Sequence, residues 1–104
     1  MASYQVQISE RAEKEIRRLP GNFRQRVIRL LHNLEHIPQP VDSIPLDLTD
    51  SSIILAADME LRRIRMEVWR ILYLIEHDIH LITILTIRKR PPYQYEDLAD
   101  LLIP

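Results

Sequence analysis

Residues 61–90 read LRRIRMEVWRILYLIEHDIHLITILTIRKR, and this stretch decides the fold. Much of it alternates between the two faces of an extended chain, which is the period of β-strands. It predicts three strands, at Leu61–Met66, Trp69–Glu76 and Ile79–Arg88, with a tight turn at His77-Asp78. Strands joined by such short connections must run antiparallel. We therefore predict an antiparallel sheet at the centre of the protein.

The sequence before this sheet predicts one further strand and two helices. Residues 4–8 alternate between apolar and polar side chains, and Ser9 follows where a helix N-cap belongs. Pro20-Gly21 ends the first helix, because neither residue continues a helix well. A second helix is expected from about Asn22 to His36. Two helices joined by so short a turn form an antiparallel hairpin.

The whole pattern predicts one α+β domain over residues 1–104. An N-terminal strand precedes a two-helix hairpin packed on a mainly antiparallel sheet, and a short C-terminal helix is expected over Tyr95–Ile103. The segment Pro38–Ser52 contains three prolines and is expected to be a loop. The second face of the sheet is expected to be uncovered. The expected core contains Ile16, Leu19, Val27, Leu31, Leu34, Ile71, Tyr73 and Ile82.

Charge is segregated along the chain, although the net charge is only -1. Residues 35–60 hold six acidic residues and no Lys or Arg, whereas residues 61–90 hold six Arg and one Lys against three acids. A local basic surface can bind a polyanion whatever the net charge of the protein. The sequence therefore allows a nucleic-acid partner.

Several classes of site are not expected. There is no cysteine, so the chain has no disulfide and no thiolate nucleophile. His32 and His36 lie four apart on the second helix without a third ligand, and Gly21 is the only glycine, so we expect neither a metal site nor a glycine-rich phosphate loop. No cofactor is expected. Without a signal-peptide pattern or a long apolar stretch, the protein is expected to be cytoplasmic and not in a membrane.

The basic residues gather around two points of the predicted sheet. Arg63, Arg65 and Arg70 flank one strand connection, and Arg88, Lys89 and Arg90 end the last strand, just before Tyr93 and Tyr95. Antiparallel pairing brings Arg70 and Arg88 to the same end of the sheet. Alternation places Arg70 on the face of Leu72 and Leu74, and Arg88 on the face of Ile82 and Ile84. We expect these arginines to be exposed.

Cations beside a phenol suit the cleavage of RNA. They bind a phosphate and stabilise the negative charge that develops when it is attacked. RNA supplies its own nucleophile, the 2′-hydroxyl, so the protein has only to align it and remove its proton. Neighbouring arginines lower the pKa of a phenol and make it a better base. The alternative interpretation is that the arginines only solvate an exposed face of the sheet.

Three stretches resemble one known family. The segment LRRIRMEVWRILY, Leu61–Tyr73, resembles the central signature of RelE/ParE toxins, in which two basic residues precede a glycine turn and an aromatic-Arg pair. The segment TIRKRPPYQYEDL, Thr86–Leu98, is similar to the Arg-then-Tyr ending of RelE-like members. The opening, YQVQISERAEKEIRRLP, looks like the first strand and helix of the family. The resemblance covers nearly the whole chain, and Glu67 stands where many relatives have glycine.

The resemblance implies the toxin of a bacterial type II toxin–antitoxin system with the RelE-like microbial ribonuclease fold. In the RelE branch, the implied activity is metal-independent, ribosome-dependent cleavage of mRNA, which blocks translation. The implied partners are a cognate antitoxin, in a heteromeric complex, the ribosome and mRNA. The implied catalytic residues are Arg63, Arg65, Arg70, Arg88 and Tyr93, with Tyr95 as an alternative base. RNA binding is expected of Arg62, Lys89, Arg90 and Tyr95.

Two other functions stay open at this point. The ParE branch shares the fold but inhibits DNA gyrase and cleaves no RNA, so the fold alone does not decide between the branches. The combination of Arg70, Arg88 and Tyr93 favours the RelE branch. The other alternative is an inactive toxin that only binds its antitoxin and acts as a co-repressor.

Overall fold

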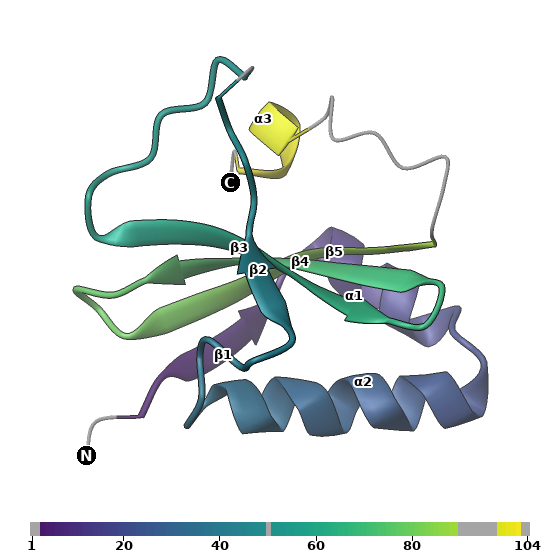
Figure 1. Ribbon diagram of the computed structural model, residues 1–104. Coiled ribbons are helices and arrows are strands. Elements are labelled where there is room, and N and C mark those ends of the chain that lie inside the picture. Colours follow the sequence, from purple (N-terminus) through teal and green to yellow (C-terminus); the bar gives the residue numbers. More distant parts are fainter. Residues whose placement is uncertain (1–2, 50, 90–97, 103–104) are drawn as a thin grey trace.

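A computed structural model describes residues 3–49, 51–89 and 98–102 of the protein (Figure 1). The expected α+β class is confirmed. The elements follow in the order β1 (Gln5–Ile8), α1 (Glu10–Arg17), α2 (Gly21–Leu34), β2 (Ser43–Pro45), β3 (Met59–Met66), β4 (Trp69–Glu76), β5 (Leu81–Lys89) and α3 (Leu98–Leu101). In the part of the chain that is described, no helix has both the length and the hydropathy to cross a bilayer.

The five strands form one sheet in the order β1-β5-β4-β3-β2. The strands β2 to β5 pair antiparallel with their neighbours, whereas β1 pairs parallel with β5. The parallel pair is possible because the whole helical hairpin and three strands separate the two in sequence. Strand β2 corrects the sequence interpretation, since its residues were expected in a loop. It is a three-residue edge strand that ends at a proline, which an edge tolerates.

Helices α1 and α2 cover the same face of the sheet (Figure 1). The side chain of Ser9 caps α1 by accepting a hydrogen bond from the amide of Ala12 at 3.1 Å. Apolar side chains of α1 and α2 pack on those of the three central strands to form the main core. Its buried members include every core residue expected from the sequence: Ile16, Leu19, Val27, Leu31, Leu34, Ile71, Tyr73 and Ile82.

The second face of the sheet is partly covered, which corrects the expectation of an open face. A second core cluster joins Leu61, Leu72 and Leu85 to Leu98 of α3. Partly buried side chains from residues 46–55 pack against the same cluster. The irregular segment before β3 therefore serves as a cover for the sheet, together with α3, as Figure 1 shows above β3 to β5.

A β-bulge in β5 changes which side chains share a face. Leu72 pairs with Thr86 while its neighbour Tyr73 pairs with Ile84, so Leu85 is the extra residue on β5. Alternation along β5 is thereby shifted by one position. Ile82 and Ile84 lie in the helix-side core. The sequence-based placement of Arg88 on their face is therefore wrong.

Candidate functional site

Three arginines lie side by side across the three central strands. The register places Arg65 of β3 opposite Arg70 of β4, and Arg70 opposite Arg88 of β5. We call these three residues the arginine row. Arg63, two residues before Arg65 on β3, shares their face of the sheet. The expected approach of Arg70 to Arg88 is thus found, although the bulge, and not simple alternation, produces it.

The arginine row concentrates positive charge at one end of the sheet. Like charges placed directly opposite each other on neighbouring strands destabilise a sheet. Arg63 adds to the positive charge, and its Nε atom is buried without a hydrogen-bond partner among the described residues. A phosphate group on this face would relieve the repulsion and accept hydrogen bonds from several guanidinium groups.

Arg70 differs from the other members of the row because it is buried, with only 3% of its surface exposed. Its Nη1 atom donates hydrogen bonds to the carbonyl oxygens of Glu67 and Trp69, both at 3.1 Å. These carbonyls belong to the connection between β3 and β4. Arg70 therefore stabilises this turn, and the expectation that it is exposed is wrong. Arg65 is exposed and Arg88 is half-buried.

The turn that Arg70 braces consists of Glu67 and Val68, because Met66 pairs with Trp69. Glu67 has a φ of 54°, in the left-handed region that favours glycine. This backbone conformation is consistent with the glycine that the resemblance predicts at this turn. The carboxylate of Glu67 pairs with the guanidinium of Arg26 on α2, which links the turn to the helical hairpin.

Two expected RNA-binding residues lie apart from the arginine row. Arg62 is held at the other side of β3, where its guanidinium donates to Ser43 at 3.0 and 3.2 Å and to Glu60 at 3.0 Å. Lys89 is exposed, and its ammonium lies 6.0 Å from the centre of the Trp69 ring. Since Trp69 packs against the helix-side core, Lys89 points away from the row.

The remaining expected residues, Arg90, Tyr93 and Tyr95, lie outside the described part of the chain. Their roles stay predictions. Two polar residues near the row were missed in the sequence: Glu15 of α1 and Thr86 of β5, whose side chains hydrogen-bond to each other. No residue-type pattern marks this pair, because the two lie 71 positions apart.

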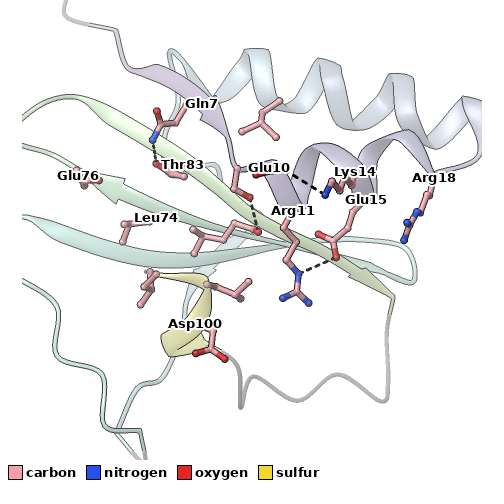
Figure 2. A pocket seen from close by; sticks show the side chains of 15 residues that line it. Gln7, Glu10, Arg11, Lys14, Glu15, Arg18, Leu74, Glu76, Thr83 and Asp100 are labelled. Atoms are coloured by element: carbon pink, nitrogen blue, oxygen red, sulfur yellow. Dashed lines mark hydrogen bonds and ion pairs between the residues drawn. The ribbon is translucent and has the colours of Figure 1, made fainter. Parts of the chain in front are cut away.

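A groove of 1020 Å³ runs beside this pair, between α1, the edge of β5 and α3 (Figure 2). Arg11 and Lys14 of α1 and Arg18, directly after α1, line the groove, and leucines of β4, β5 and α3 supply its apolar part. The described residues contain no cluster of three side chains that suits a metal ion.

At the opposite end of the sheet, a carboxylate and not an arginine is at the centre of a polar network. Burial alone would raise the pKa of Glu60, but hydrogen bonds from His77, Arg62 and Gln39 together lower it below the ordinary value. His77 in turn bonds to the hydroxyl of Tyr4 at 2.6 Å. This network links the start of β1 to β3 and to the β4–β5 turn, so its position suits a structural role.

Comparison with solved structures places the fold. The chain is similar to the archaeal RelE–RelB complex from Pyrococcus horikoshii, with 26% identity, a TM-score of 0.74, and coverage of 89% of this chain and 100% of the archaeal one. It is also similar to the RelBE-type toxin–antitoxin complex of Mycobacterium tuberculosis, with 22% identity, a TM-score of 0.66, and coverage of 85% and 99%.

A mutant of the E. coli toxin RelE in the free state shares the fold at 16% identity, with a TM-score of 0.63 and coverage of 99% and 100%. No protein-family model matches the sequence, and a search of curated proteins found no significant match. The similarity to the archaeal protein, which extends over nearly the whole chain, shows that this chain has the RelE-like fold.

Proposed function

We propose that the protein is the toxin of a type II toxin–antitoxin pair and that it cleaves mRNA on the ribosome. The observation that supports this activity best is the arginine row, Arg65, Arg70 and Arg88, on one face and at one end of the sheet. Three adjacent cations match the charge of a phosphate that gains a further negative charge during attack. They do not by themselves distinguish mRNA from another polyanion.

In the proposed reaction the 2′-oxygen of one nucleotide attacks the adjacent phosphorus. The bond to the 5′-oxygen of the next nucleotide breaks, which leaves a 2′,3′-cyclic phosphate upstream and a 5′-hydroxyl downstream. A base removes the proton of the 2′-hydroxyl, and the leaving 5′-oxygen takes up a proton. We assign the base to Tyr93, with Tyr95 as the alternative, and expect no metal or cofactor.

The arginines have different parts in this proposal. Arg65 and Arg88 flank Arg70 in the row, so we assign the direct phosphate contacts to them and to Arg63. Arg70, whose Nη1 atom is engaged by two carbonyls, adds positive potential beneath the phosphate. Such donors act most strongly when they are fixed before the reaction begins.

We also propose a cognate antitoxin that binds this chain in a heteromeric complex. The similar proteins from P. horikoshii and M. tuberculosis were both solved as toxin–antitoxin complexes. Expression of the chain alone should then arrest growth, and co-expression of the neighbouring gene should restore it. Harmless accumulation of the folded protein would contradict the toxin assignment.

The test of the activity is translation in vitro with and without the protein, followed by mapping of mRNA ends. We expect new upstream ends that carry a 2′,3′-cyclic phosphate, only on translated mRNA, and unaffected by EDTA beyond its effect on the ribosome. Intact mRNA in this assay, together with inhibition of DNA supercoiling by gyrase, would reject the nuclease in favour of the ParE-like function. Intact mRNA and unaffected gyrase would favour the co-repressor.

A further inference from the structure

The outer edge of β5 is held by α1 where the neighbouring strand ends. Strand β1 pairs with β5 only as far as Ile84. Beyond that point the hydroxyl of Ser9 donates to the carbonyl of Leu85 at 3.1 Å, and the amide of Ile87 donates to Oε1 of Glu15 at 3.0 Å. Glu15 therefore takes the acceptor position that a further strand would otherwise supply.

Glu15 also sets the direction of a buried hydroxyl. Thr86 is fully buried, and its Oγ1 atom lies 2.8 and 3.0 Å from the two carboxylate oxygens of Glu15. An ionised carboxylate only accepts hydrogen bonds, so the hydroxyl of Thr86 must donate its proton to Glu15. The lone pairs of Oγ1 are then left to accept from another donor.

That donor is Arg88 of the arginine row. Its Nε atom donates to Oγ1 of Thr86 at 3.4 Å, which is long for a hydrogen bond. Arg88 and Thr86 stand two positions apart on β5 and on the same face. A connected path of polar groups thus runs from α1 through the sheet edge to the guanidinium of Arg88.

We propose that Glu15 and Thr86 are positioning residues that orient the guanidinium of Arg88 toward the scissile phosphate. The inference rests on the proposed function, because it assigns Arg88 a phosphate to bind. Glu15 keeps the hydroxyl of Thr86 turned so that its oxygen faces Arg88. Neither residue has to touch the RNA, since a guanidinium with a fixed Nε presents its remaining donors in a fixed plane.

Thr86→Val removes the hydroxyl and keeps the shape of the side chain, and Thr86→Ser keeps the hydroxyl. Glu15→Gln retains an acceptor for the amide of Ile87, but its amide group donates to Thr86 and competes with Arg88. Glu10→Gln is the matched control, because Glu10 lies on the same helix, is exposed and pairs with Lys14 at 3.6 Å. Glu15→Gln also serves if Thr86→Val does not fold.

The first measurement is the single-turnover rate of mRNA cleavage on programmed ribosomes at saturating protein. Thr86→Val and Glu15→Gln should slow cleavage about tenfold, the value of one hydrogen bond to a charged group. Thr86→Ser and Glu10→Gln should cleave at the rate of the wild type. The affinity for the ribosome should change by less than about twofold, since the transition state and not the ground state is affected.

The second measurement does not depend on activity. The Nε–H resonance of Arg88, identified with Arg88→Lys, should shift and exchange faster with solvent in Thr86→Val than in the wild type or Thr86→Ser. The positioning role would be overturned if the Arg88 resonance were unchanged in Thr86→Val. It would also be overturned if Thr86→Val and Glu15→Gln both cleaved mRNA at the rate of the wild type. A wild-type protein that cleaves no RNA would instead reject the proposed function, while the resonance would still decide whether Glu15 and Thr86 orient Arg88.

Discussion

Replacement of Arg70 by Met tests whether a member of the arginine row also stabilises the fold. Methionine keeps much of the length of the buried side chain but removes the guanidinium, which donates to the carbonyls of Glu67 and Trp69. Hydrogen bonds from a charged group contribute about 1.5–3 kcal/mol each. The lower value applies here, because carbonyls of a surface turn regain water when the donor is lost.

Repulsion reduces this loss. Arg70 faces Arg65 on one side and Arg88 on the other, and each opposed pair of like charges costs up to about 1 kcal/mol. We therefore expect Arg70→Met to lower the free energy of unfolding by about 2 kcal/mol. For a domain of this size, that corresponds to a fall in Tm of about 8–16 °C.

The assay is urea unfolding followed by circular dichroism, with Arg65→Met as the control. Arg65 belongs to the same row and carries the same charge, but it is exposed. Its replacement removes one opposed pair of charges and none of the hydrogen bonds that Arg70 donates to the turn, so stability should stay the same or rise by up to about 1 kcal/mol. Equal stability of the two variants would refute the structural role of Arg70. If the role holds, loss of toxicity in an Arg70 variant has to be judged against its folded fraction.

Four further predictions follow from other parts of the molecule. Leu31→Ala, at a site that is 5% exposed, should cost about 2–5 kcal/mol in urea unfolding, and a loss below 1 kcal/mol would contradict its place in the core. Arg88→Ala should slow mRNA cleavage by about 10²–10³-fold without lowering Tm, because the change also removes the repulsion with Arg70; full toxicity would remove Arg88 from the site. Glu67→Gly should be more stable than Glu67→Ala by about 1 kcal/mol, because only glycine relieves the left-handed backbone, and equal Tm values would show that no strain is present. The pKa of Glu60 is lowered in the fold, so its stabilising contribution is present above the ordinary value of 4.5 and is lost as pH falls through the folded-state value; Glu60→Gln should flatten the acid limb of the stability profile, and an unchanged limb would reject this linkage.

The parts of the fold that were predictable are those in which apolar side chains recur at the spacing of a helix or a strand. Val27, Leu31 and Leu34 recur at helical spacing, and Ile71, Tyr73 and Ile75 alternate along β4, so burial of one face follows from the sequence. The break between the two helices is equally clear, because Pro20 cannot continue α1; in the structure it is the N-cap of α2, which begins at Gly21.

The position of the bulge was not predictable, because the adjacent apolar residues Ile84 and Leu85 interrupt the alternation without showing that the strand continues through an extra residue. The bulge reverses the face of every later side chain on β5, and with it the position of Arg88. The burial of Arg70 could not be predicted either, because most arginines in proteins are exposed. Only the structure shows the backbone carbonyl groups that accept hydrogen bonds from its buried guanidinium. Glu15 was missed for a related reason: its partners come from the other end of the chain.

The parallel pairing of β1 with β5 affects the order in which the strands of the sheet can pair during folding. Residues 5–8 find their partners at residues 81–84, so the first strand made is joined to the sheet only after the last strand is made. Contacts at such sequence separation form late and slow the folding of a domain. Strand β5 also carries Arg88 and Thr86, which Glu15 of the N-terminal helix holds. During synthesis of the protein the arginine row is therefore incomplete until Arg88 has been added to the chain.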